Sequence, residues 1–393
     1  MTSLSERTPT RAIVLLAVAA VASHAMVRIS DPLVPQIAAD IGTTVGAASI
    51  VASAYAVSHG LTQAVAGPLG DRWPKYPTVA VLCILSGLGT LACGLAQSLA
   101  GLGLARLLCG IAAGMIIPLG MAYIGDVVPY ERRQPVLGRF LTGQISGLIL
   151  GQAAGGILGD YFGWRTVFFV LAAMFLIATA GLVLELSVNP LTRVSPRAET
   201  RSGLIAGYRH VLSRPWARFV TLCAFIEGVL MFGSFAYVGA DLHVRQGLSF
   251  SAVGLVLGLF GAGGLVYAAS VQHLLNRLGQ SGLAAGGGII LGICYLALAA
   301  GLHWSVGFIA IGVIGLGFFM LHNTLQVNAT QMAPEARSTA LGIFSAALYL
   351  GQSFGIALAA PVIDRFGAPP VFVVSALLLP LLALWFAAGL RRQ

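Results

Sequence analysis

Three ionisable side chains lie within eight positions of one apolar run of this chain. His24, Arg28 and Asp31 occur in the sequence HAMVRISDPLVP, which also contains Pro32 and Pro35. A carboxylate among apolar residues needs a partner cation, which it can exchange for a proton or a substrate contact. The two prolines free backbone carbonyls and bend a helix. The stretch is therefore a candidate site for moving a proton or a polar solute through lipid.

A second acid, Glu227, lies in the apolar sequence CAFIEGVLMFG, where Gly228 beside it leaves room. It is roughly ten residues, or about 15 Å, into its run and thus near the middle of the membrane. His322, Asn323 and Gln326 occur together in LHNTLQVNAT. A histidine there can titrate near neutral pH. We expect Glu227 and His322 to be proton-coupling residues; a structural role for each is the alternative.

Depth along the helices predicts a partner for Asp31. Both Asp31 and Arg106 are about six residues, or roughly 9 Å, from the outer ends of their runs, so they can meet. Arg28, one turn before Asp31, is a second possible partner. A permanent structural pair of Arg28 and Asp31 is the alternative to a coupling role.

Polar uncharged and histidine side chains in other apolar runs suit the lining of a substrate cavity. Tyr55, His59 and Gln63 follow an i, i+4, i+8 pattern on one helical face. The other expected cavity residues are Gln144, Gln352, Asn323 and Gln326, with Gln152 a further candidate.

These residues must be positioned by membrane-spanning helices. The chain is 58% hydrophobic and only 9% charged, against about 25% charged in soluble domains. Runs of about 20 apolar residues are long enough to cross a bilayer. Twelve are predicted, at residues 12–36, 48–69, 77–97, 101–124, 135–158, 164–187, 216–238, 251–271, 281–301, 304–328, 339–360 and 369–390. The expected fold class is an all-α membrane protein.

The positive charges predict the orientation. With the N-terminus in the cytoplasm, 16 of the 22 lysines and arginines fall on the inner side, as the positive-inside rule requires. Both termini are then cytoplasmic. This bias explains the net charge of +9 without a nucleic-acid partner. The alternative of a cleaved signal ending near Ala25 leaves an odd helix number, and the five cysteines, all in predicted helices, imply neither disulfides nor a metal site.

The sequence repeats itself at a spacing of 204 residues. Seven residues of the first half have an identical residue 204 positions later. The residues of the first half are Glu131, Arg133, Gly138, Gly147, Gly151, Asp160 and Gly163, and their matches are Glu335, Arg337, Gly342, Gly351, Gly355, Asp364 and Gly367. Internal repeats are how many secondary transporters are built. We predict a six-helix bundle at residues 1–187, a cytoplasmic linker at 188–215 and a second six-helix bundle at 216–393. Residues 202–212 of the linker form either a short surface helix or a loop.

Several motifs carry a family resemblance. The sequence GPLGDRWPK is similar to the signature G-x-L-[GA]-D-R-x-G-R/K of the major facilitator superfamily, with Pro74 at a glycine position. It contains Gly67, Gly70, Asp71, Arg72 and Lys75. A weaker copy, NRLGQ, lies between the eighth and ninth runs. Arg106, Gly110 and Gly114 resemble the family's R-x-x-x-G-x-x-x-G element. The fifth run resembles the exporter element G-x-x-x-G-P-x-x-G-G through Gly147, Gly151, Gly155 and Gly156, with Gln152 in place of proline.

The chain thus resembles the drug:proton antiporter and sugar-efflux (arabinose efflux permease-like) branch of that superfamily. The resemblance implies twelve helices in two pseudo-symmetric six-helix bundles. It also implies an inner gate in which Asp71 and Arg72 contact Glu131, Arg132 or Arg133, with topological anchoring as the alternative. The glycines of the fifth run are expected to allow close packing and a bend; packing alone is the alternative.

The energy source is constrained by an absence. Lys75 is the single lysine, and no G-x-x-x-x-G-K-[ST] sequence occurs, so ATP is not the expected driver. No nucleophile-and-base arrangement or metal-ligand spacing indicates an enzyme, and no cofactor is expected. We expect a monomeric, proton-coupled exporter of a small organic molecule or drug in a bacterial inner membrane. The alternatives are a gradient-driven importer or uniporter, which Gln152 favours, and a transport-inactive membrane sensor.

Overall fold

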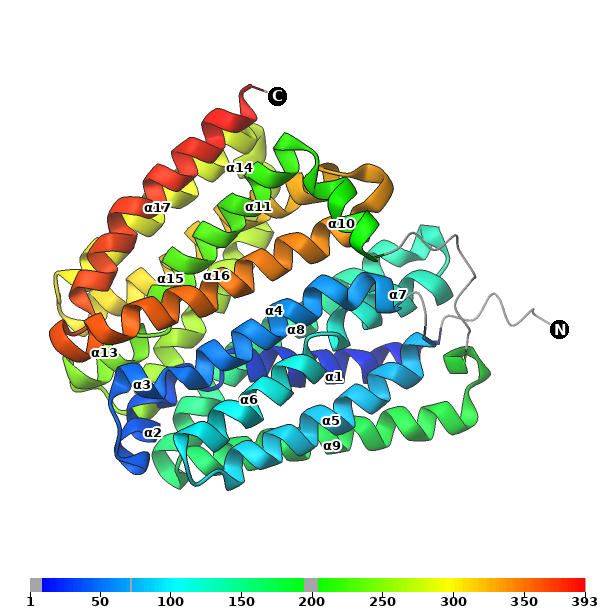
Figure 1. The fold of residues 1–393 in the computed structure, drawn as a ribbon, viewed down its shortest axis with the longest axis horizontal. Coiled ribbons are helices and arrows are strands. Elements are labelled where there is room, and N and C mark those ends of the chain that lie inside the picture. The colour runs from blue at the N-terminus through cyan, green and yellow to red at the C-terminus, as the bar shows by residue number, and fades with distance from the viewer. Residues whose placement is uncertain (1–8, 71–72, 194–203, 393) are drawn as a thin grey trace.

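The computed structural model describes residues 9–70, 73–193 and 204–392, and within these ranges every regular element is helical (Figure 1). The helices of the first half are α1 (Thr10–Arg28), η2 (Asp31–Leu33), α2 (Val34–Ile41), α3 (Val45–Ala48), α4 (Ile50–Gly70), α5 (Lys75–Leu95), α6 (Leu99–Ala113), α7 (Ile116–Val127), α8 (Tyr130–Phe162), α9 (Trp164–Val188) and η3 (Pro190–Arg193). The expected all-α fold class is confirmed.

The second half is also built from helices. Its helices are α10 (Leu204–Leu212), α11 (Pro215–Glu227), η4 (Gly228–Phe232), α12 (Gly233–Phe235), α13 (Val238–Val244), α14 (Phe250–Ala299), α15 (Trp304–Gln331), η5 (Pro334–Ala336), α16 (Arg337–Phe366) and α17 (Pro369–Leu390). Of the two possibilities for the linker, the described part forms the short helix α10.

The described residues contain ten helical stretches that are long and apolar enough to cross a membrane. One of them, α14, is two spans, because Gly279 at φ 63° and ψ 176° breaks it into residues 250–278 and 280–299. Helix α4, with 21 residues, is not among the ten and supplies another. Counted in this way, the described residues contain the twelve spans that the sequence predicts.

Three of the predicted spans are interrupted, and two of the interruptions fall at polar residues. In the fourth span, α6 ends at Ala113 and α7 begins at Ile116. The first span leaves α-geometry after Arg28 and continues as a 3₁₀ turn from Asp31 to Leu33, because Pro32 has no N–H to continue the helix. The seventh span widens after Glu227 into the π-helical turn η4. Such π segments are frequent at functional sites.

Two large hydrophobic cores hold the described helices together, and a third, small cluster consists of Tyr267, Leu283 and Met320. One large core is formed by residues between Ala12 and Leu182, and the other almost entirely by residues between Val211 and Ala387. Large apolar side chains on the outer surface remain exposed, for example Ile177 at 70% and Leu377 at 62%. Such a surface is stable where hydrocarbon covers it.

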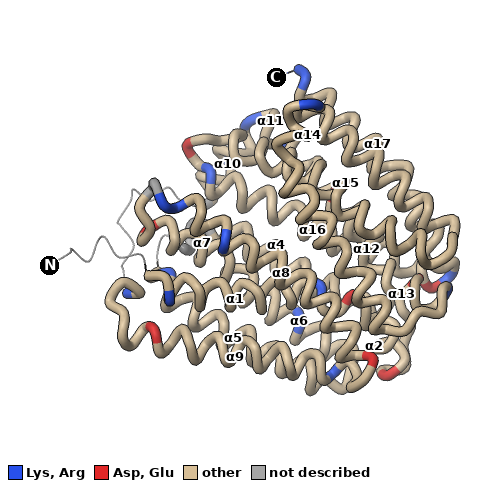
Figure 2. The backbone as a smooth tube through the Cα atoms, turned by 180° about the vertical axis from the view of Figure 1, so that it is seen from behind, with Lys and Arg blue, Asp and Glu red and all other residues tan. Residues whose placement is uncertain are grey.

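The start of α1 and the end of α17 lie at one end of the helices, and the blue segments of Figure 2 gather towards that end. The opposite end carries the turns after α8 and α16, where Gly163 and Gly367 adopt positive φ angles of 81° and 74°. We call this opposite end the distal end. The two glycines belong to the 204-residue repeat, so the repeat places the same turn twice.

Candidate functional site

Arg28 and Asp31 form a buried ion pair at the break in the first span. The distance from Arg28 Nη1 to Asp31 Oδ2 is 3.4 Å, and the two residues are 3% and 1% exposed. Arg28 is the last residue of α1, and Asp31 opens the 3₁₀ turn that follows, so the two are three positions apart and can face each other. The other oxygen, Asp31 Oδ1, has no hydrogen-bond partner in the described part of the protein.

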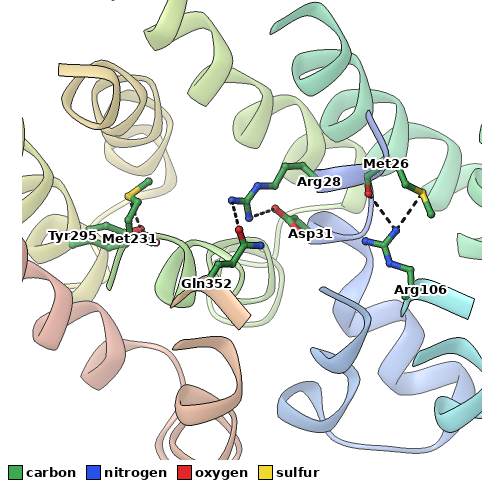
Figure 3. A network of polar contacts seen from close by, with 7 residues as sticks. All are labelled: Met26, Arg28, Asp31, Arg106, Met231, Tyr295 and Gln352. Carbon is green, nitrogen blue, oxygen red and sulfur yellow. Dashed lines mark hydrogen bonds and ion pairs between the residues drawn. The ribbon is translucent and has the colours of Figure 1, made fainter. Parts of the chain in front are cut away.

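Arg28 also reaches across into the second half (Figure 3). Its Nη2 donates to Gln352 Oε1 at 3.4 Å. Its guanidinium carbon lies 4.0 Å from the ring centroid of Phe232 and 5.7 Å from that of Phe235. Stacking of a guanidinium on aromatic faces is favourable, and more so away from water. Arg28 therefore joins the first span to η4, α12 and α16.

Arg106 does not meet Asp31. Its Nε donates to the Val51 carbonyl at 2.8 Å, and its Nη1 donates to the Met26 carbonyl at 3.2 Å; Figure 3 shows the latter bond. Its guanidinium lies over the Tyr55 ring, 4.5 Å from the centroid. The first expectation for Asp31 is corrected here to its second, Arg28. Depth in the membrane follows from position along the run, but the direction in which the Asp31 side chain points does not.

The two remaining proton-coupling candidates form a pair. Glu227 ends α11 and is fully buried, and its Oε2 lies 2.9 Å from His322 Nδ1 on α15. The imidazole of His322 stacks on Phe318 at a centroid distance of 4.8 Å, and Phe344 is 5.4 Å away. Glu227 Oε1 is without a hydrogen-bond partner among the described residues. An acid and a base from different helices thus share one hydrogen bond inside the second half.

The π turn that follows Glu227 is supported by side chains of other helices. Tyr295 OH donates to the Met231 carbonyl at 2.7 Å, and Ser375 Oγ donates to the Leu230 carbonyl at 2.8 Å (Figure 3 shows the former). In lipid, carbonyls released from regular helix geometry need such donors. The irregular turn is therefore held in place, and it carries Phe232 to Arg28.

The stripe of Tyr55, His59 and Gln63 lies along α4 as its spacing predicts. The Tyr55 and His59 rings are 5.2 Å apart, and Gln63 Nε2 lies 3.3 Å from His59 Nε2. Gln63 also donates to the Gly114 carbonyl at 3.1 Å. Across the interface, Tyr349 of α16 faces His59 at a centroid distance of 4.4 Å. Sequence reasoning missed Tyr349, although it lies one turn before Gln352 on the same helix.

The other expected cavity residues differ in their burial and in their hydrogen-bond partners. Asn323 is half-buried, whereas Gln326 is exposed and joins neither polar cluster. Gln144 is half-buried, and its side-chain nitrogen is unpaired in the described structure. Gln152 is fully buried, and both polar atoms of its amide are unpaired there. Gln352 is thus the glutamine that the structure brings into contact with the charged pair.

The expected inner-gate motif is only partly visible. Asp71 and Arg72 lie outside the described residues, and Gly67, Gly70 and Glu131 are described only as helix backbone. Lys75 Nζ lies 2.5 Å from Asp126 Oδ2, which links the start of α5 to the end of α7.

Of the two arginines expected at this gate, Arg132 is exposed. Arg133 donates to the carbonyls of Gly125, at 2.5 Å, and Val128, at 3.2 Å. These carbonyls lie in the last turn of α7 and just after it, where a cation complements the helix dipole.

The four glycines of the fifth span face two different helices. Gly147, Gly151 and Gly155 pack on the backbone of α1, and a β-carbon at Gly151 would lie 2.7 Å from Ala25 Cα. Gly156 instead packs on α14 of the second half, where a β-carbon would lie 2.7 Å from Gly254 Cα. Three glycines therefore fix contacts within the first half, and the fourth allows contact between the halves.

Replacing Gly151 with alanine is expected to lower the free energy of unfolding by about 1–3 kcal/mol, because α1 and α8 must move apart to admit the methyl group. Unfolding of purified protein in detergent measures the effect. Gly138→Ala, on the same helix, is the control, since a β-carbon there meets nothing within 4 Å. Equal losses of stability in the two variants would contradict this account of the packing.

The described residues contain twelve membrane spans, a repeated half and ionisable pairs buried in the spans. Together these features define the class of secondary transporters rather than that of enzymes. The comparisons with known proteins agree. A model of the Major Facilitator Superfamily matches residues 16–356. The chain belongs to this superfamily of transporters.

The individual relatives support the same family. The chain is 28% identical over 339 residues to an uncharacterized transporter, YceJ of Bacillus subtilis, with 84% of this chain and 83% of the relative covered. It is 24% identical over 347 residues to a chloramphenicol resistance protein of Streptomyces lividans, with 88% and 87% covered. Among solved structures, a mutant of the nucleoside transporter NupG matches with a TM-score of 0.80 and 13% identity, over 96% of this chain and 99% of that one. This last likeness concerns the fold.

Proposed function

We propose that this protein exports a small organic molecule in exchange for protons. Residues 1–187 and 216–393 are the two bundles, which rock about the interface that Arg28 crosses, and residues 188–215 link them in the cytoplasm. Both termini then face the cytoplasm of a bacterial cell, in its inner membrane, and a monomer suffices.

The observation that carries this proposal is the Glu227–His322 pair. A carboxyl group buried among apolar helices binds and releases a proton only when its surroundings change. His322 supplies a hydrogen-bond partner 2.9 Å away, and the unpaired Glu227 Oε1 is left for a second one. A proton can therefore be held at a point that the rocking of the bundles exposes first to one side and then to the other.

Export is favoured by one of the relatives. The Streptomyces lividans protein is named for chloramphenicol resistance, and its likeness covers 88% of this chain. Chloramphenicol-like compounds, which are small and carry both polar and aromatic groups, are the first substrates to test. The aromatic and amide side chains near the interface, such as Tyr55, Tyr349 and Gln352, suit such molecules.

A gradient-driven importer is the second candidate. It is favoured by Gln152, which stands where the exporter element has proline and whose buried amide is unpaired in the described structure. An unpaired amide inside the membrane is available for a polar solute.

Proteoliposomes with an imposed pH gradient test the proposal. A panel of neutral, cationic and anionic compounds that includes chloramphenicol and nucleosides is loaded on either side, and pH changes are followed with an enclosed dye. We expect at least one compound to move against its concentration gradient while protons move in the opposite direction. Movement of solute and protons in the same direction would instead support the importer, and solute movement without protons would contradict coupling.

A further inference from the structure

A carboxylate of the first half caps a helix of the second half at the distal end. Asp160, near the end of α8, accepts hydrogen bonds through Oδ2 from Ser251 N at 3.1 Å and Ser251 Oγ at 2.6 Å. Ser251 is the second residue of α14, where the backbone N–H has no partner within the helix. Ser249 caps the same helix by accepting from Ala252 N.

A carboxylate of the second half makes the reverse contact. Asp364, near the end of α16, accepts from Gly46 N at 2.8 Å through Oδ1 and from Thr44 Oγ1 at 2.7 Å through Oδ2. Gly46 is the second residue of α3, and Thr44 caps α3 by accepting from Ala47 N. The arrangement at Asp160 is thus repeated with the roles of the halves exchanged.

The repetition is encoded in the chain. Asp160 and Asp364 are 204 positions apart, the spacing of the internal repeat. The close contacts beside them repeat as well. Gly156 packs on Gly254, and one repeat later Ala360 packs on Gly46, where a β-carbon would collide with the Ala360 carbonyl. Each carboxylate therefore lies one helical turn beyond a contact at which the backbones of the two halves touch. We call the contact of Gly156 with Gly254 the Asp160 seam, and that of Ala360 with Gly46 the Asp364 seam.

The surroundings suit a contact that forms and breaks. Asp160 and Asp364 are exposed, so water can replace their hydrogen bonds when the halves separate. A negative charge at a helix N-terminus is nevertheless favourable, and each aspartate satisfies one N–H that would otherwise need water. Capping is therefore strong enough to favour the state in which the two halves are in contact at the distal end. It is also weak enough for the halves to separate there.

We propose that Asp160 and Asp364 are paired latches that hold the distal end shut, and that both must release before this end can open. The proposal rests on the alternating access described under the proposed function, but not on the identity of the substrate or on proton coupling. The Asp364 seam has one extra contact between the halves, a hydrogen bond of 2.8 Å from Tyr237 OH to Ser49 Oγ. The Asp160 seam is therefore the weaker one.

The test measures a distance across the distal end, without any substrate. Phe162→Cys and Phe366→Cys place spin labels on the exposed ends of α8 and α16, at 67% and 68% exposed positions of opposite halves. The five native cysteines are buried and stay unlabelled. Double electron–electron resonance then gives the populations of short and long separations for protein in lipid nanodiscs.

We expect Asp160→Ala to raise the ratio of long to short separations by about fivefold, the effect of a typical lost helix cap. Asp364→Ala is expected to have a smaller effect because Tyr237 still joins that seam. The double variant is expected to exceed both single variants. Asp160→Asn and Asp364→Asn, which keep one acceptor but lose the charge, are expected to lie between the parent and the alanine variants, and they provide the readout for any alanine variant that does not fold.

Asp40→Ala is the matched control. Asp40 also lies at the distal end and pairs with an arginine, but its partner Arg165 belongs to the same half. We expect its distance distribution to equal that of the parent. The proposal is overturned if the double variant keeps the parental distribution, or if Asp40→Ala lengthens the separation as much as Asp160→Ala does. The distance measurement needs neither substrate nor protons, so a transport assay that shows no proton coupling would not change its outcome. The proposal of paired latches and the proposal of proton-coupled export can therefore fail independently.

Discussion

Replacing Glu227 with glutamine is expected to abolish accumulation driven by a pH gradient. Glutamine has nearly the same size and keeps one acceptor towards His322, but it cannot bind and release a proton. A gradient of about one pH unit supports at most about tenfold accumulation per proton, and the variant is expected to reach no more than equal concentrations on the two sides. Uptake into proteoliposomes, with and without the gradient, measures this loss.

Glu185→Gln is the matched control for this variant. Glu185 is also buried, at 3% exposure, but it pairs with Arg11 at the start of α1, with 3.2 Å between Arg11 Nε and Glu185 Oε2. We expect accumulation to persist in this control. Full accumulation by Glu227→Gln would remove Glu227 from proton coupling and leave it a structural partner of His322.

Replacing Asp31 with asparagine is expected to lower the free energy of unfolding by about 3–5 kcal/mol, because it leaves the guanidinium of Arg28 buried without a countercharge. The double variant Asp31→Asn, Arg28→Gln is expected to regain most of this loss. Combining Asp31→Asn with Arg106→Gln is expected to give additive losses, since Arg106 bonds to backbone carbonyls instead. Unfolding in detergent supplies all three comparisons.

The same variants distinguish a coupling pair from a structural one. For a coupling pair, the double variant is stable but builds no substrate gradient, because no group at that depth carries the proton. For a structural pair, stability and transport return together. If the stability losses of the Asp31 and Arg28 substitutions are additive, the 3.4 Å contact between the two residues contributes little to the free energy of unfolding.

The sequence is informative about the fold because hydrophobicity is a property of each run by itself. The twelve apolar runs and the 204-residue repeat predict the spans and the paired turns at Gly163 and Gly367. Interruptions within spans are harder to predict. Pro32 indicates the first, but the π turn at Gly228–Phe232 has no comparable signal, since no proline causes it and side chains of α14 and α17 support it.

The candidate site shows where reasoning from single residues ends. Glu227 and His322 are each predicted from their own chemistry, yet their contact depends on how α11 and α15 are rotated about their axes, and no spacing in the sequence encodes that rotation. For the same reason, the argument from depth favours Arg106 as the partner of Asp31, whereas the contact is with Arg28. Phe232 and Tyr349 were missed because an aromatic residue in an apolar run looks like any other packing residue until a cation or a histidine is found against it.

The pairing of Arg28 with Asp31 also has an electrical consequence. Both residues belong to the first half and are three positions apart, so they travel together in any movement of that half against the other. With Asp31 ionised, their charges cancel, and the membrane voltage does no work on the pair. Protonation of Asp31 leaves the charge of Arg28 uncompensated, and one charge moved through the full field is worth about 2.3 kcal/mol per 100 mV. One proton on this carboxyl group therefore converts an electrically silent movement into one that voltage can drive.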